Sequence, residues 1–149
     1  MKLVHRAAIL AATLSLALTA PAIAQDAYPM DQGDFVEISA IQIDDGHGLD
    51  YANHLAGQWR RGQEFAKSQG WITSYEVFAN VHPRKGEPDI YLMVRSPRLA
   101  DAVEDVKRDA AYRAYMQRTI AQMQAESGDR AKFRKLAGSQ LLRELRFKK

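Results

Sequence analysis

The order of two hydrophobic patterns along the chain is the feature that most constrains its fold. Segments rich in β-branched and aromatic residues, with apolar side chains alternating at a period of two, are typical of strands. They span residues 35–43, 71–81, 90–95 and 140–147. Two other segments, 49–69 and 97–126, repeat apolar residues at helical spacing. The sequence therefore predicts the order β-α-β-β-α-β.

This order is that of the ferredoxin-like, split β-α-β arrangement, an α+β fold. We expect a four-stranded antiparallel sheet with both helices on one face, because each β-α-β crossover is right-handed. The other face would remain uncovered, and a monomer rarely exposes a large apolar patch. We therefore expect a homodimer that pairs these open faces. The expected members of the open face are Phe35, Glu37, Ser39, Ile41, Tyr91, Met93 and Arg95.

Glycine, serine and proline predict where the helices begin and end. Gly70 is expected to end the first helix in a left-handed conformation, and Ser96–Pro97 to begin the second one as N-cap and first helical residue. The apolar stripe of the second helix is interrupted near Arg108–Asp109, which predicts a kink or two consecutive helices. Gly57 and Gly62 inside the first helix indicate either close contact with the sheet or a loosely formed helix.

The first 24 residues have the pattern of a signal peptide. A basic start precedes residues 7–20, an apolar run of 14 residues without a charge, and small residues follow up to Ala24. A membrane span needs about 20 apolar residues, so this run is too short for one. We expect cleavage near Ala24, a periplasmic or secreted protein, and no membrane span in the mature chain.

The remaining residues are expected to form one domain, with a flexible lead-in over 25–33 and the fold over 34–149. The leader carries Lys2 and Arg6 and no acid, so the 21 Lys and Arg against 18 Asp and Glu of the whole chain become 19 against 18. This near-neutral charge argues against nucleic-acid binding. The chain has no cysteine, which excludes disulfides and thiolate metal sites.

Over residues 34–147 the element order, the small size and the half-apolar open face resemble the dimeric α/β-barrel superfamily. Its members include cofactor-free monooxygenases, haem enzymes and lactone isomerases, so the resemblance implies a homodimer and a cavity between two sheets without implying one activity. The chain also resembles uncharacterised exported bacterial proteins around NVHPRKGEPD. Haem-binding members supply an axial histidine, but the second helix has none and His54 falls beside the apolar stripe of the first. We expect no cofactor.

Candidate chemistry is concentrated on the predicted sheet. Glu37 and Glu76 are expected to face the barrel interior from adjacent strands, near Tyr91 and Arg95. A carboxylate in a water-poor cavity titrates high and can remove a proton. The alternative is an ion pair with Arg95 across the dimer, which would set its register. The candidate ligand contacts are Phe78, Asn80 and Met93.

Other polar and aromatic motifs have structural interpretations. HPRKGEPD (residues 82–89) is predicted to be a hairpin turn with exposed cations at its tip. The acidic segment 44–50 lacks the ligand spacing of a calcium loop, so no metal site is expected. The large side chains of the second helix either belong to the core or line an apolar channel. They are Tyr112, Tyr115, Met116 and Met123.

Three functions remain open from the sequence. The first is binding of a small apolar or aromatic molecule by a dimeric α/β-barrel protein. The second is catalysis by a cofactor-free monooxygenase or isomerase that uses a barrel carboxylate. The third is a structural or interaction role without a ligand.

Overall fold

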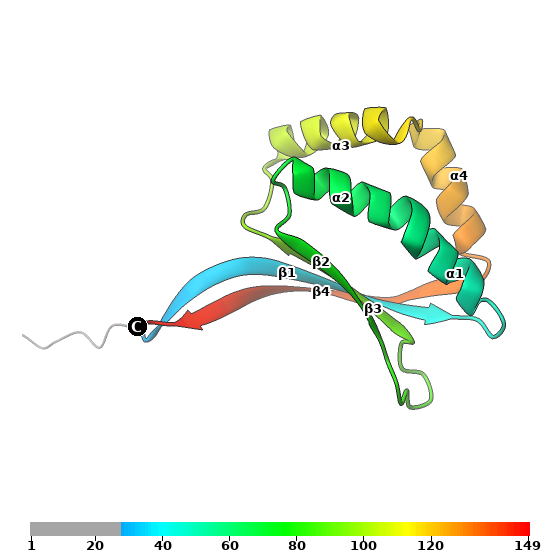
Figure 1. Ribbon diagram of the computed structural model, residues 1–149, viewed down its shortest axis with the longest axis horizontal. Coiled ribbons are helices and arrows are strands. Elements are labelled where there is room, and N and C mark those ends of the chain that lie inside the picture. Colours follow the sequence, from blue (N-terminus) through cyan, green and yellow to red (C-terminus); the bar gives the residue numbers. More distant parts are fainter. Residues whose placement is uncertain (1–27) are drawn as a thin grey trace, which may run out of the picture.

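The computed structural model describes residues 28–149, and these form an α+β fold with one antiparallel sheet (Figure 1). The strands are β1 (Met30–Ile43), β2 (Ser74–Ala79), β3 (Ile90–Ser96) and β4 (Arg134–Phe147). They lie in the order β2-β3-β1-β4, and all neighbours are antiparallel. This sheet is compatible with the predicted ferredoxin-like fold. The predicted signal peptide and its cleavage site lie outside the described residues.

The first helical region follows the prediction closely. It consists of α1 (Gly48–His54), a π-helical segment η1 (Leu55–Trp59) and α2 (Arg60–Ser68), which continue one into the next. Gly70 has a φ of 69° directly after this region, so the predicted left-handed glycine is confirmed. No helix within residues 28–149 is long and apolar enough to cross a membrane.

The second helical region is divided, as predicted, but at a different place. Helix α3 (Ala102–Met116) begins after Asp101, whose carboxylate accepts the N–H of Glu104 at 2.8 Å. The predicted start at Ser96–Pro97 is therefore wrong, because this aspartate caps the helix instead. The helix passes Arg108–Asp109 without a break and ends at Gln117, which has a φ of 55°. Helix α4 (Ile120–Arg130) follows.

Strands β1 and β4 are longer than predicted. They pair from Met30 with Phe147 to Ile43 with Arg134, with two shifts of register. Consequently β1 begins inside the expected lead-in of residues 25–33, and β4 begins six residues before 140. The alternating patterns identified only the C-terminal parts of these strands, whose ends at Ile43 and Phe147 agree with the prediction. The earlier residues of each strand lack the alternation and are held by the hydrogen bonds between the two strands. Figure 1 shows the paired ends extending beyond the helices.

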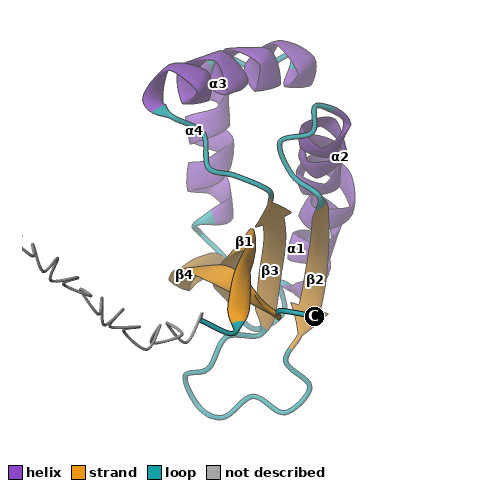
Figure 2. Cartoon of the chain, turned by 90° about the vertical axis from the view of Figure 1, so that its left-hand side faces the viewer, coloured by secondary structure: helices purple, strands orange, loops and turns teal. Residues whose placement is uncertain are grey.

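The helices all lie on one side of the sheet, as Figure 2 shows. The buried cluster between the two layers contains Ile41 and Leu92 from the sheet and Tyr51 and Leu55 from the helices. Side chains alternate between the two faces along a strand. Since Ile41 belongs to this cluster, the odd-numbered residues of β1 from Phe35 to Ile41 lie on the helix side.

This register corrects the predicted open face. Tyr91, Met93 and Arg95 do lie on the open side, opposite Ala40, Ile38 and Val36 of β1. The other predicted members lie on the helix side: Phe35, Glu37, Ser39 and Ile41. Strand β1 carries large apolar side chains on both faces, so its alternation does not indicate which face the helices cover.

The core of one subunit is small for a chain of this length. None of the described side chains is less than 2% exposed. The apolar stripe of α3 is open to solvent, with Val103 66% and Val106 70% exposed, and β4 ends in the exposed Phe147. The described residues therefore leave apolar surface uncovered on both sides of the sheet.

Candidate functional site

The predicted ligand residues of the open sheet face form a shallow apolar depression. It has a volume of about 360 Å³ and draws one or more side chains from each of the four strands. The lining residues are Ile38, Phe78, Tyr91, Met93 and Gln140. The structure thus brings Phe78, Tyr91 and Met93 together on one surface, where Phe78 is half exposed. A surface of this composition attracts apolar or aromatic groups rather than ions.

Asn80 has a structural role beside this depression. Its side-chain amide donates to the carbonyl of Pro88 at 3.1 Å, and its backbone N–H donates to the carbonyl of Asp89 at 2.8 Å. These bonds close the loop between β2 and β3. The Asn80 amide is therefore used by the hairpin and is not among the residues that line the depression.

The predicted pair of carboxylates is not formed. Glu37 pairs with Val94 on the helix side, whereas Glu76 pairs with Met93 on the open side. Strands β1 and β2 are not adjacent, because β3 lies between them. Within the described residues, neither carboxylate has a cationic group within 4.0 Å. The alternative, an ion pair with Arg95 across a dimer, stays a prediction.

Glu76 still has an unusual environment. Its Oε2 atom is shielded from solvent and has no hydrogen-bond partner among residues 28–149. Arg95, two residues from Met93 along β3, acts on Glu144 instead. The pKa of Glu144 is lowered mainly by hydrogen bonds from the Arg146 side chain and the Asp34 N–H, and the Arg95 guanidinium lowers it further. The open face therefore has an apolar centre with charges at its border.

The loop HPRKGEPD is a turn, as predicted. Gly86 has a φ of 85°, and the N–H of Glu87 donates to the carbonyl of Arg84 at 2.9 Å. The side chains of Arg84 and Glu87 form an ion pair on the surface of this loop. Among residues 28–149, no three His, Asp or Glu side chains come together in a way that could hold a metal ion.

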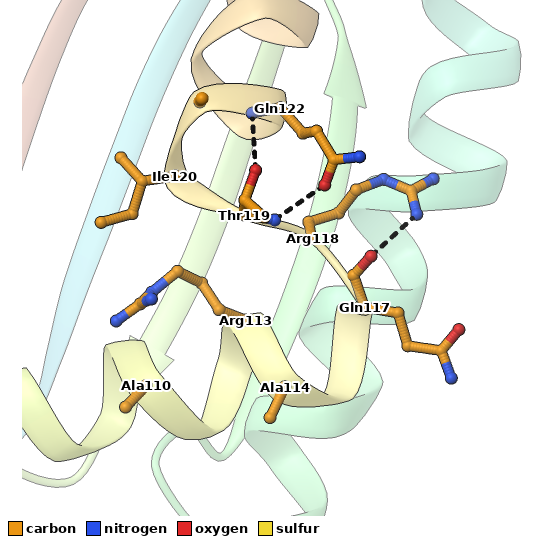
Figure 3. A pocket seen from close by; sticks show the side chains of 9 residues that line it. Ala110, Arg113, Ala114, Gln117, Arg118, Thr119, Ile120 and Gln122 are labelled. Atoms are coloured by element: carbon orange, nitrogen blue, oxygen red, sulfur yellow. Dashed lines mark hydrogen bonds between the residues drawn. The ribbon is translucent and has the colours of Figure 1, made fainter.

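A hollow of about 710 Å³ lies where α3 meets α4 (Figure 3). Its polar groups are already used by the helix junction. Thr119 Oγ1 accepts the N–H of Gln122 at 3.2 Å, and the Thr119 N–H donates to Gln122 Oε1 at 2.9 Å. This reciprocal capping box begins α4. The hollow is open and shallow, and its hydrogen bonds stabilise the junction rather than offer a binding site.

A second pocket, which sequence reasoning missed, lies between the two helical regions on the helix side of the sheet. It has a volume of about 140 Å³. Its lining residues are His54, Gln58, Trp59, Tyr112, Met123 and Arg130. Gln58 and Trp59 lie in η1, and π-helical segments are frequent at functional sites because they redirect side chains.

This inner pocket has a positive electrostatic character. The Nε atoms of Arg130 and Arg134 are both shielded from solvent without a hydrogen-bond partner. Burial, followed by repulsion from Arg134, lowers the pKa of Arg130. The nearby Glu126 carboxylate accepts hydrogen bonds from Arg118 at 2.8 Å and from Gln58. The two guanidiniums are therefore only partly compensated by acidic groups.

His54 is neutral at physiological pH in this environment. Burial lowers its pKa to about 4, with smaller contributions from Arg130 and Arg134. Burial also raises the pKa of Tyr112, which keeps its phenol protonated. The inner pocket thus combines a neutral imidazole, a phenol and a guanidinium with the apolar surfaces of Trp59 and Met123.

The sequence contained part of the signal for this pocket. Tyr112 and Met123 were expected either in the core or along an apolar channel, and they line the pocket. Met116 is buried and Tyr115 stacks on Phe65 at 4.2 Å between ring centroids, so these two belong to the packing of the helices. Arg130 lies at the end of α4, and only the fold shows that it meets His54.

No known protein family and no curated protein matches the chain in sequence. A functional conclusion therefore depends on the geometry of the sheet face and of the inner pocket. The sheet face is apolar and open, whereas the inner pocket is smaller and cationic. Both are suited to binding.

Proposed function

We propose that the mature chain is an exported homodimeric protein that binds a small apolar or aromatic molecule. The observation that carries this proposal is the depression around Phe78, Tyr91 and Met93 on a sheet face that none of the helices within residues 28–149 covers. Export rests on the signal-peptide pattern of residues 1–24. The dimer pairs the open faces of two subunits, as the resemblance to the dimeric α/β-barrel superfamily implies.

The small core supports this pairing. Burial of apolar surface is the main source of folding and association energy, and one subunit leaves much of its apolar surface exposed. Pairing two open faces removes the side chains of both depressions from water. A cavity remains between the sheets where the two depressions oppose each other, and its apolar walls favour an apolar or aromatic ligand.

Binding is favoured over catalysis because the structure separates the carboxylates that an enzyme would use. Glu37 lies on the helix side, so Glu76 is the remaining acid of the proposed site, with Tyr91 along the sheet. No general acid or second base accompanies it within a hydrogen bond. A single carboxylate without such a partner does not define a reaction.

The proposed interface is tested with the variants Phe78→Ala and Met93→Ala. Val77→Ala is the matched control, because Val77 is 44% exposed on the same strand but lies on the helix side. A half-buried phenylalanine contributes about 1 kcal/mol, and the dimer contains two copies. Phe78→Ala is therefore expected to raise the dimer dissociation constant about 30-fold in sedimentation equilibrium, while Val77→Ala leaves it unchanged.

Native mass spectrometry of the mature protein completes the test. A dimer that carries a co-purifying small molecule supports the whole proposal. A dimer without a ligand, which also binds no aromatic compound, supports the purely structural role instead. A monomeric wild-type protein, or an equal effect of Val77→Ala, contradicts the interface.

A further inference from the structure

Two cations at the inner pocket, Arg130 in its lining and Arg134 close to Arg130, lack the acidic partners that buried cations normally have. Arg130 and Arg134 are both half-buried, and among the ion pairs of the described residues neither takes part in one. Each has an Nε–H group that is shielded from solvent and donates to no atom of the subunit. Buried charges are usually paired or hydrogen-bonded, so an acceptor is missing here.

The acidic residues nearby already have other partners. The two oxygens of Glu126 accept from Arg118 and Gln58. Asp129, the neighbour of Arg130 in the chain, pairs with Lys132 at 2.7 Å. The described part of the chain therefore does not supply the missing anionic acceptor. One uncharged group, the Gln58 side-chain oxygen, lies at 3.4 Å from Arg130 Nη1.

The other walls of the pocket define the kind of anion that fits. Trp59, Tyr112 and Met123 present aromatic and thioether surface beside the guanidinium. The pocket volume is about 140 Å³, and an engineered cavity of about 150 Å³ holds one benzene ring. The available space thus corresponds to about one aromatic ring. A bare inorganic anion would leave the apolar walls without a contact.

We propose that the inner pocket binds a small aromatic monocarboxylate. The ring lies among Trp59, Tyr112 and Met123, and the carboxylate accepts hydrogen bonds from the Arg130 guanidinium, whose planar donors match a carboxylate. The neutral imidazole of His54 lines the same pocket and adds no charge to it. This site lies inside one subunit on the helix side, so it is independent of the proposed dimer and of the sheet-face ligand.

Benzoate is the probe that tests the site, with binding measured by isothermal titration calorimetry on the mature protein. Two matched compounds separate its parts: benzyl alcohol has the ring without the charge, and acetate has the charge without the ring. Benzoate is expected to bind at least tenfold more tightly than either one. Equal binding of benzyl alcohol contradicts the role of the guanidinium, and equal binding of acetate contradicts the role of the aromatic walls.

Variants place the binding in this pocket. Arg130→Met is expected to lower benzoate affinity at least tenfold. Arg113→Met is the control, because Arg113 lies on α3 and already pairs with Asp109 at 2.9 Å. It should leave the affinity unchanged. Without benzoate, Arg130→Met should not lower the melting temperature, because it removes an unpaired charge. A clear loss of stability would show that Arg130 has a structural partner and would overturn the proposal.

A sheet-face variant separates this inference from the proposed function. Phe78→Ala changes only the open side of the sheet and is expected to leave benzoate affinity unchanged. If Phe78→Ala abolishes benzoate binding while Arg130→Met does not, the aromatic ligand belongs to the sheet face. That result would contradict the inner site and leave the proposed dimer intact.

Discussion

Replacing Gly62 by alanine is expected to destabilise the protein, although the same change stabilises most helices. Gly62 is the buried residue of α2, and it contacts the ring of Tyr112 on α3. A Cβ atom at this position would lie 2.6 Å from Tyr112 Oη and 2.9 Å from Tyr112 Cε2. Both distances are shorter than a normal van der Waals contact. The glycine therefore allows α2 and α3 to approach each other.

The magnitude follows from two opposing effects. Alanine in place of glycine stabilises a helix interior by about 1 kcal/mol. Inserting a methyl group into an occupied space costs about 1–3 kcal/mol, because neighbouring side chains must move. The Tyr112 ring is half-buried and lies near Phe65, so it is not free to swing away. We expect Gly62→Ala to lower the free energy of unfolding by about 1 kcal/mol.

Gly57 offers a matched control on the same helical region. A Cβ atom at Gly57 has no neighbour within 4 Å, so Gly57→Ala is expected to raise the free energy of unfolding by up to about 1 kcal/mol. Urea denaturation of both variants at one protein concentration measures the difference. In a Tyr112→Phe background, which removes the closest atom, Gly62→Ala should be less harmful. The reasoning is refuted if Gly62→Ala stabilises the protein as much as Gly57→Ala does.

Two further predictions concern pH and helix capping. The pKa of His54 is lowered from 6.5 to about 4 in the folded protein, so the unfolded chain binds more protons between these values and stability should fall as the pH is lowered from 6.5 to 4. Because this side chain is only half-buried, we expect the free energy of unfolding to fall by about 1 kcal/mol over this pH range. Urea midpoints measured between pH 6.5 and pH 4 test this, and the decrease should be smaller in His54→Gln. If the midpoints of His54→Gln depend on pH as strongly as those of the wild type, the assignment to His54 is contradicted. Thr119→Ala removes the capping box of α4 and should lower the free energy of unfolding by about 1 kcal/mol, whereas Thr119→Ser should retain the capping box. Thermal melting of both variants measures the difference. Equal melting temperatures for Thr119→Ala and the wild type would show that the cap contributes nothing.

Much of the fold was predictable from local patterns. Strand alternation and helical spacing identified the element order, and Gly70 and Gly86 marked the end of α2 and a turn of the β2–β3 loop. These features depend on residues close together in sequence, so they need no tertiary information. The helix ends were predicted less well. The interruption near Arg108–Asp109 lies on a continuous helix, where the Arg108 side chain packs over the Trp71 ring and pairs with Glu104. The real break occurs at the left-handed Gln117.

The candidate sites were predicted less completely than the fold. Phe78, Tyr91 and Met93 were expected together, and they share the open face because the spacing of β2 and β3 is regular. The predicted pairing of Glu37 with Glu76 was wrong because the alternating side chains of β1 were assigned to the wrong faces of the sheet. A shift of one residue moves every side chain of a strand to the other face, so such an error affects the whole site.

The sequence by itself determined the kinds of elements and their order, because these follow from local conformational preferences and hydrophobic periodicity. Only the tertiary structure decided which face of β1 the helices cover and which distant residues meet. The inner pocket shows this clearly: His54 and Arg130 lie on different helical regions, and no spacing in the sequence relates them. Their contact results from the packing of these helical regions on one side of the sheet.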